Sequence, residues 1–135
     1  MANIHKENRS ILEVQLANIS NVPQIAYENV PYVPTTGTSY IKVDYLPTSR
    51  RPAVRGLNPQ QRYDGIFAIN CYAPEGNGPS AAETIAENVM TAFEATSSFT
   101  TNNVTVSIDY AEADQALVDS PWFLVPVNIG WYAYK

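Results

Sequence analysis

The amino-acid sequence predicts an α+β domain: a single mostly antiparallel or mixed sheet of about five strands, with two helices packed on one face. In two segments apolar residues recur every three or four positions, which is typical of amphipathic helices. In five others they alternate with polar residues or run continuously, which is typical of strands. The order is helix, three strands, helix, two strands. This lack of regular strand–helix alternation favours α+β over a parallel α/β sheet.

Length and composition bound the domain. The chain has 135 residues, 45% of them hydrophobic, so we expect one domain over residues 1–135 with a core that needs no disulfide or metal. No apolar run approaches the roughly 20 residues that cross a bilayer, and no membrane partner is expected. The N-terminus lacks the apolar core and cleavage site of a signal peptide, so we expect a product that stays in the cytoplasm.

The first half of the chain opens with a predicted helix over residues 3–19, which stops before Pro23. A short strand is expected over residues 24–30. The loop that follows, residues 31–39, is too rich in proline, threonine and glycine for regular structure. Residues 40–47 alternate apolar and polar side chains and predict the second strand.

The second half contains three predicted strands. Residues 63–73 are apolar on both faces, which predicts a central strand. Residues 104–110 alternate cleanly, and a polar connection joins them to the last strand, residues 122–134. Pro126 cannot donate to a ladder, so it needs an edge, a bulge or an outward-pointing position in that strand.

The second helix is predicted over residues 80–95. Ser80 and Glu83 have the spacing of a capping box, in which the serine oxygen accepts from the N–H of Glu83 and the carboxylate accepts from the N–H of Ser80. The segment before the helix, residues 75–80, leads into a helix N-terminus as anion sites do. It has no lysine, lacks the P-loop pattern and carries Glu75, so we interpret it as a turn and a cap.

The sequence contains few residues of the types that act in catalysis or bind metals. Cys71, the only cysteine, is expected to be a buried hydrophobe, and His5, the only histidine, is expected to face solvent near the start of a helix. One cysteine and one histidine provide neither a zinc site nor a nucleophilic triad. Four acids follow the fourth strand: Asp109, Glu112, Asp114 and Asp119.

Paired carboxylates can hydrolyse glycosides or bind Mg²⁺, so a small hydrolase that uses these four acids stays an alternative. Acids on the solvent side of a strand and its exit are usually only solvated. We therefore expect no catalytic residue, no metal, no cofactor and no enzymatic activity.

Four arginines form the most unusual feature of the sequence: Arg50, Arg51, Arg55 and Arg62. They fall within the proline-broken stretch of residues 49–65, and no acid lies between the first and the last of them, although the net charge of the chain is -5. The connection between the two neighbouring strands, roughly fourteen residues, is long enough to indicate function or disorder.

Three interpretations of this arginine loop remain: a solvated loop, a phosphate- or nucleic-acid-binding element, and a protein-docking arm. The acidic remainder of the chain and the lack of aromatic residues between the arginines count against nucleic acid. Arginine is preferred at protein interfaces, where its planar fork pairs with carboxylates. We therefore favour an arm that docks on an acidic partner.

Local sequence over most of the chain carries a resemblance to a known family. The matching segments are "HKENRSILEVQLANI", "IAYENVPY", "YIKVDYLP", "RYDGIFAINCYAPEGNGPSAAETIAENVMTAFEA", "VTVSIDYAE" and "WFLVPVNIGWYAY". In wording and order they resemble the phage tail terminator proteins of long-tailed bacteriophages, the lambda-type group. None of them is a catalytic motif.

The resemblance implies a structural protein of the virion tail or neck that assembles in the host cytoplasm. Members of this group form homo-hexameric rings that cap the tail tube, stop the addition of tube subunits and present the surface to which the head is joined, without catalysis or cofactor. The implied partners are further copies of the chain, the major tail tube protein and a head completion or connector protein, with the tape measure protein as a further candidate. DNA passes through the lumen without specific binding, which the acidic charge fits.

By position, the arginine loop corresponds to the long loop that reaches toward the tube in this group. Head–tail connector proteins of the neck share the element order and stay an alternative. Aromatic residues crowd the last strand, where Trp131 is expected in the core. Trp122, Tyr132 and Tyr134 are candidates for contacts between subunits, because tyrosine and tryptophan bury large areas at interfaces.

Overall fold

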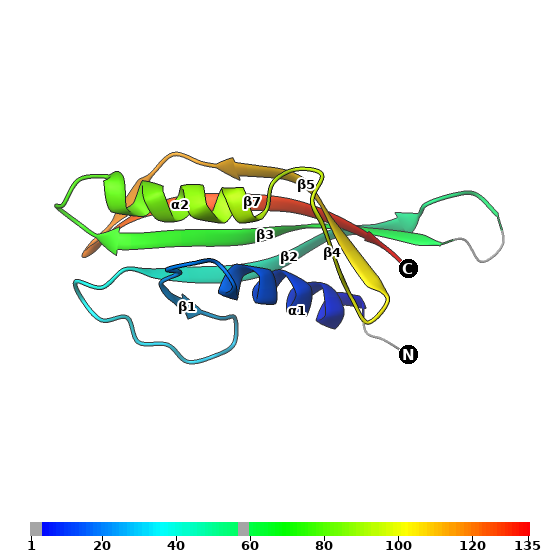
Figure 1. Cartoon of the computed structure of the whole chain (residues 1–135), viewed down its shortest axis with the longest axis horizontal. Helices are drawn as coiled ribbons and strands as arrows, with labels where there is room; N and C mark the ends of the chain where they lie inside the picture. Colours follow the sequence, from blue (N-terminus) through cyan, green and yellow to red (C-terminus); the bar gives the residue numbers. More distant parts are fainter. Residues whose placement is uncertain (1–3, 57–59) are drawn as a thin grey trace.

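The computed structural model describes residues 4–56 and 60–135 (Figure 1). Within them the chain forms two helices, α1 (Ile4–Ala17) and α2 (Ser80–Ala92). The strands are β1 (Gln24–Ala26), β2 (Tyr40–Pro52), β3 (Gln61–Pro74), β4 (Ser98–Thr101), β5 (Val104–Ala113), β6 (Leu117–Asp119) and β7 (Trp122–Tyr134). The predicted α+β class is confirmed.

The strands of the described residues form one sheet in the order β1-β2-β3-β7-β5-β4, and β6 also pairs with β7. Only β1 with β2 is parallel, and the other pairs are antiparallel. The prediction of about five strands is wrong, because β4 and β6 are additional. β6 lies in the stretch interpreted as a polar connection, where three exposed residues pair with the start of β7.

The sheet curls into a half-barrel around the helices (Figure 1). α1 packs mainly on β5 and β4, whereas α2 packs mainly on β7 and β3. The prediction of two helices on one face therefore holds only broadly, because in the curled sheet each helix packs mainly on different strands. α1 also contacts segments next to both edge strands. Asn102, which follows β4, donates to Glu7 at 3.2 Å, and Arg9 pairs with Glu28, which follows β1, at 2.7 Å.

The main core lies on the concave side of the sheet, and its burial is the chief driving force of folding. β7 contributes alternate residues, as its sequence pattern predicts: Phe123, Val125, Val127, Ile129 and Trp131. Cys71 on β3 is fully buried, which confirms that prediction, and burial raises its pKa to about 12. A thiol with that pKa stays protonated at neutral pH, so it is a small apolar side chain rather than a nucleophile.

Pro126 lies in an interior strand, between β3 on one side and β5 with β6 on the other. Its carbonyl accepts a bond from the N–H of Asp114 at 2.9 Å, where the chain has just left β5. The side of Pro126 that lacks an N–H therefore faces the gap between the end of β5 at Ala113 and the start of β6 at Leu117. An interruption of the neighbouring strand accommodates the proline.

The predicted capping box does not form. Pro79 has helical backbone angles and occupies the N-cap, so α2 begins at Ser80 without a side-chain cap. The N–H of Glu83 donates to the carbonyl of Pro79 at 3.0 Å, which is an ordinary helical bond, so it is not available to the serine. The helix ends at Ala92 instead of residue 95.

The predicted exposure of His5 is also wrong. His5 is half-buried, its Nδ1 lies 2.8 Å from the Tyr45 hydroxyl, and its ring meets Tyr45 and Tyr63 edge-on. The first turn of α1 is therefore packed against β2 and β3. Contacts between residues so distant in sequence leave no signal in a helical pattern.

Candidate functional site

The predicted arginine loop is mostly strand. β2 and β3 continue beyond the core as one antiparallel hairpin, in which Arg51 lies opposite Arg62. Of the four predicted arginines only Arg55 lies in the connection, which is therefore shorter than roughly fourteen residues. We call residues 47–56 with 60–62 the arm. It extends from one end of the elongated molecule (Figure 1).

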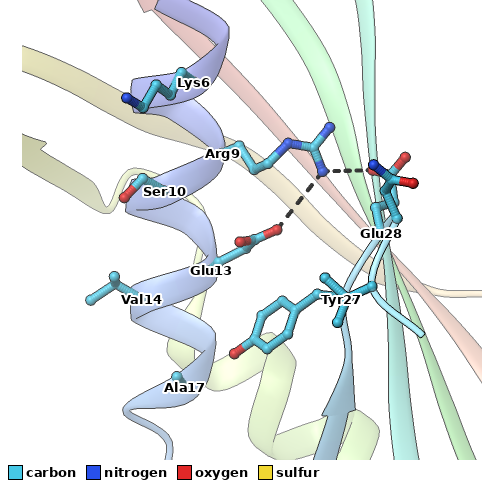
Figure 2. A pocket seen from close by; sticks show the side chains of 10 residues that line it. Lys6, Arg9, Ser10, Glu13, Val14, Ala17, Tyr27 and Glu28 are labelled. Carbon is cyan, nitrogen blue, oxygen red and sulfur yellow. Dashed lines mark hydrogen bonds and ion pairs between the residues drawn. The ribbon is translucent and has the colours of Figure 1, made fainter. Parts of the chain in front are cut away.

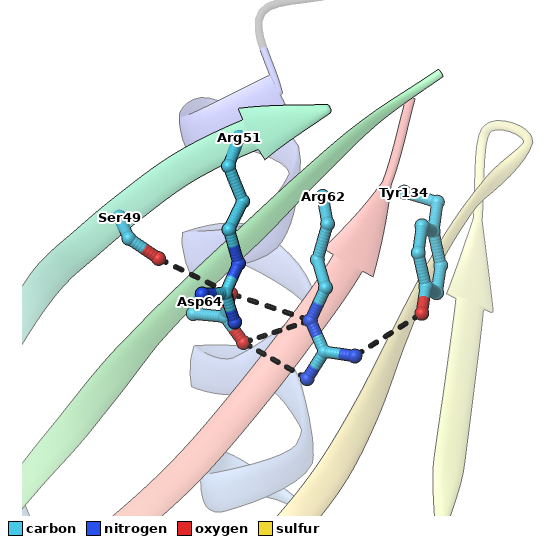
Figure 3. A network of polar contacts seen from close by, with 5 residues as sticks. All are labelled: Ser49, Arg51, Arg62, Asp64 and Tyr134. Carbon is cyan, nitrogen blue, oxygen red and sulfur yellow. Dashed lines mark hydrogen bonds and ion pairs between the residues drawn. The ribbon is translucent and has the colours of Figure 1, made fainter. Parts of the chain in front are cut away.

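A polar network around Asp64 forms the base of the arm (Figure 3). Arg62 donates from Nε to the Asp64 carboxylate at 3.1 Å, and its Nη2 also lies 3.1 Å from that group. Its Nη1 donates to the Tyr134 hydroxyl at 3.2 Å. The Ser49 hydroxyl donates to Asp64 at 3.2 Å, and Arg51 reaches the same carboxylate at 3.9 Å.

Arg62 therefore ties the base of the arm to β7. Its guanidinium carbon lies 4.4 Å from the centre of the Tyr132 ring, and its hydrogen bond to Asp64 raises its pKa. The sequence interpretation missed both partners. The contact with Asp64 could have been predicted, because residues two apart on a strand share a face. The contact with Tyr132 could not, because Tyr132 lies seventy residues away along the chain.

The other three arginines face solvent. The Arg51 side chain is 67% exposed and reaches Asp64 only at the long distance given above. Arg50 lies 5.7 Å from the centre of the Tyr63 ring. Arg55 is exposed and forms no ion pair with the described part of the chain. Together with Val54, which is 64% exposed, they present three cations and an apolar side chain to solvent.

The three aromatic residues predicted to contact other subunits do not form one group. Trp122 is only 7% exposed and packs with Tyr40 and Tyr72 on the outer face of the sheet. Tyr132 and Tyr134 lie at the other end of β7, beside Arg62. Tyr134, which is 42% exposed, is the most accessible of the three, whereas Trp122 already stabilises its own subunit.

The acids after the fourth strand do not converge on a centre. All four are exposed, and Asp114 accepts a bond from Asn128 at 2.9 Å. Among the described residues, no group of three or more His, Cys, Asp or Glu side chains is placed to hold a metal ion. In the same part of the chain, no helix is long and apolar enough to cross a membrane.

A groove that sequence reasoning missed lies between α1 and the segment after β1 (Figure 2). Arg9 reaches into it from α1, 2.7 Å from Glu28 and 3.8 Å from Glu13. Glu28 also accepts the backbone N–H of Tyr45 at 2.6 Å, and this bond, with help from Arg9, lowers its pKa. Burial raises the pKa of Glu13 instead.

Comparison with known families decides where this chain belongs. A family model described as "Phage tail terminator protein" matches residues 8–131. The chain belongs to the phage tail terminator family. The resemblance inferred from the sequence is confirmed, and with it a structural role in the assembly of a phage-type tail, in a family of structural proteins rather than enzymes.

Two solved structures share the fold of this tail terminator. One, whose name states no function, superposes with a TM-score of 0.69 at 18% identity and covers 96% of this chain and 90% of its own. The other belongs to a "Virion of native gene transfer agent (GTA) particle", with a TM-score of 0.65 at 12% identity and complete coverage of both chains. No curated protein sequence matches the chain.

Proposed function

We propose that this tail terminator caps the tail tube as a ring of identical subunits, six by analogy with its family, ends tube polymerisation and provides the surface to which the head is joined. The match of the family model to residues 8–131 carries the proposal. The shared fold with a component of a virion particle supports it. The protein would assemble in the host cytoplasm and remain in the neck of the virion.

The arm is the proposed contact with the tube protein. Arg50, Arg51 and Arg55 are exposed on a hairpin whose base is held by the pairing of Arg62 with Asp64. A guanidinium pairs bidentately with carboxylates, which makes an acidic surface its natural partner. Tyr134 beside this base is the proposed aromatic contact between subunits, because it is the most exposed of the three candidates.

The remaining partners follow from the ring. The face of the ring opposite the arm would meet a head completion or connector protein, and the tape measure protein would end near the lumen. The net charge of -5 allows DNA to pass without specific binding. A place in a neighbouring connector layer of the neck is the alternative position for the same fold.

Charge reversal on the arm tests its role. The triple variant Arg50→Glu, Arg51→Glu, Arg55→Glu should fold normally, because these side chains are exposed, but it should fail to cap tubes. Electron microscopy should then show tails longer than normal and without heads. Lys42→Glu reverses one exposed charge on β2 outside the arm and is the control for charge reversal itself, so it should still cap tubes. Tails of normal length joined to heads in the triple variant would sink the arm assignment.

Nucleic-acid binding is a second candidate because the structure brings tyrosines to the arginines. Tyr132 and Tyr134 lie beside Arg62 and are partly or fully exposed, which supplies the aromatic groups that the arginine stretch itself lacks. Wild-type protein should then retain DNA at low salt, with affinity that falls steeply as salt rises, and the triple variant should not. No retention by the wild type excludes this candidate.

A further inference from the structure

Exposed apolar side chains gather at the end of the subunit opposite the arm. Val33, in the loop between β1 and β2, is 87% exposed, and Leu117 and Val118 on β6 are 54% and 62% exposed. The loop and β6 both lie toward the end of the elongated molecule that the arm does not occupy (Figure 1). We call Val33, Leu117 and Val118 the apolar end. Apolar side chains that gather at one place on a surface indicate contact with another protein.

The strand register places the loop and β6 at the same end of the sheet. Tyr40, the first residue of β2, lies opposite Tyr72 on β3, Tyr72 lies opposite Leu124 on β7, and Leu124 is the partner of Leu117. Leu117 therefore shares the outer face with this row, and Val118 points to the other face of β6. Three strand spacings separate Tyr40 from Leu117, about 14 Å, so one partner can cover both segments.

A cluster of aromatic side chains supports the apolar end. On the outer face, Tyr40 stacks on Tyr72 with ring centres 4.4 Å apart, and the ring of Trp122 meets Tyr40 edge-on at 5.1 Å. Tyr32, the neighbour of Val33 in the loop, packs on Tyr40 at 5.4 Å. Trp122 also begins the strand that pairs with β6. Because the exposed side chains are carried by packed residues, a partner loses less free energy in ordering them than it would on a mobile loop.

The border of the apolar end is acidic. Four acidic residues and no basic one lie in the segments that form this end, residues 27–39, 74–79 and 113–121. Glu28 is paired with Arg9. The other three are exposed and form no ion pair with the described part of the chain: Glu75, Asp114 and Asp119. Lys42 on β2 is the base that borders the loop, so the balance stays negative.

The two ends of the subunit therefore fit different partners. The arm carries exposed arginines and fits an acidic surface. The apolar end fits an apolar patch bordered by lysine or arginine, because like charges that face each other across an interface exclude the wrong partner. In a ring whose arms all point to the tube, this end faces away from the tube, toward the side on which the head is joined.

We propose that the apolar end is the surface that docks on the head completion or connector protein, through an apolar patch of that protein bordered by basic side chains. The inference rests on the proposed function, in which the arm meets the tube. Neighbouring copies in such a ring meet along the sides of the strands, whereas the apolar end lies at their tips and stays uncovered. The carboxylates around it accelerate the encounter with a basic partner, so joining slows as salt rises.

Charged substitutions at the apolar end test the partner. Val33→Glu with Leu117→Glu should fold normally, because both side chains are exposed, and should give tails of normal length that lack heads. Val33→Ile with Leu117→Met is the matched control, because it changes the same positions but keeps them apolar, and it should join heads as the wild type does. Purified heads are mixed with tails that carry each variant, and electron microscopy counts the joined particles.

A single charge reversal tests the acidic border separately. Asp119→Lys should join heads more slowly than the wild type at low salt, and the rate should depend less on salt. Thermal unfolding at the wild-type temperature confirms that each variant is folded. Equal rates and equal salt dependence in Asp119→Lys and the wild type would show that the border takes no part in joining.

The outcomes separate this inference from the proposed function. Headless tails of normal length in the glutamate variant, with heads joined in the control, support it. Heads joined at wild-type frequency overturn it and leave the proposed function standing. Overlong tails also overturn it, because the surface then meets the tube or a neighbouring subunit. Wild-type rings that stack in solution and are separated by the glutamate variant, with heads still joined, identify a second ring as the occupant instead. If loss of the wild-type protein changes neither tail length nor head joining, both fail.

Discussion

β2 and β3 run through two different environments. Over the body, their inward side chains Val43, Phe67 and Ile69 are at most 1% exposed, and the outward ones complete the opposite face. In the arm the same two strands stay paired, after a register shift between Pro47 and Ser49, but every β2 side chain from Leu46 onward is exposed. One end of the hairpin thus packs in the core while the other end is exposed to solvent, so substitutions in the arm should leave the core unchanged.

The boundary between the two environments lies at Trp131. Its indole is 1% exposed, stacks on Tyr45 with ring centres 5.2 Å apart, and lies directly over Gly65. Beyond it toward the tip, the hairpin is held by the buried side chain of Tyr63 and by the polar network at Asp64. Substitutions on either side of this boundary measure how different the two regions are.

The largest effect is expected for Trp131→Ala. Removing this fully enclosed ring should lower the free energy of unfolding by about 3–5 kcal/mol. Val54→Ala in the arm should change it by less than about 0.5 kcal/mol. Urea unfolding of both variants measures the contrast, and comparable losses would show that the arm shares in the stability of the body.

A smaller effect is expected for Gly65→Ala. A Cβ there would overlap the Trp131 indole and the carbonyl of Leu46, neither of which can move away, so we expect a loss of about 1–3 kcal/mol. Gly130→Ala is the matched control, because the atoms nearest to its Cβ would belong to the half-buried ring of Tyr110, which can swing outward. Thermal unfolding should rank Gly65→Ala as the more destabilised, and the reverse order would contradict the enclosed position of Trp131.

The same boundary explains what the sequence could and could not predict. In the body, buried side chains impose periods of two or about 3.6, so its main strands and both helices are predictable. The arm has no buried side, and its prolines and arginines follow no period, so its strands are set only by the pairing of β2 with β3. β6 could not be predicted from the sequence for the same reason, because its three residues are all exposed.

The arginine-rich composition of the candidate site could be predicted from the sequence, but the contacts of its side chains could not. Clustered arginines identified the arm, but the separate role of Arg62 depends on Tyr132 and Tyr134, which are brought beside it by the pairing of β3 with β7. The helix cap failed in a different way. The pattern of Ser80 and Glu83 was present, but the backbone of Pro79 already occupied the position that the pattern required.

The two regions also differ in how they respond to pH. Arginines stay protonated throughout the accessible range, so the charge on the arm is constant. In the body, Arg9 lies between two carboxylates whose pKa values are shifted in opposite directions, that of Glu28 downward and that of Glu13 upward. The stability of the α1 edge should therefore depend on pH, while the charge of the arm should not.

Glu28→Gln and Glu13→Gln test this with opposite signs and give the smallest effects. The folded-state pKa of Glu28 is lowered, mainly by the N–H of Tyr45, so its contribution is present above its unfolded pKa of about 4.3 and is lost as pH falls through the folded value. Glu28→Gln should be less stable than wild type at neutral pH and should lose less stability on acidification.

Burial disfavours the charged form of Glu13, so Glu13→Gln should be as stable as wild type or more stable at neutral pH. Denaturant unfolding at neutral and acidic pH checks both, and the same sign of change in the two variants at neutral pH would refute the opposed shifts.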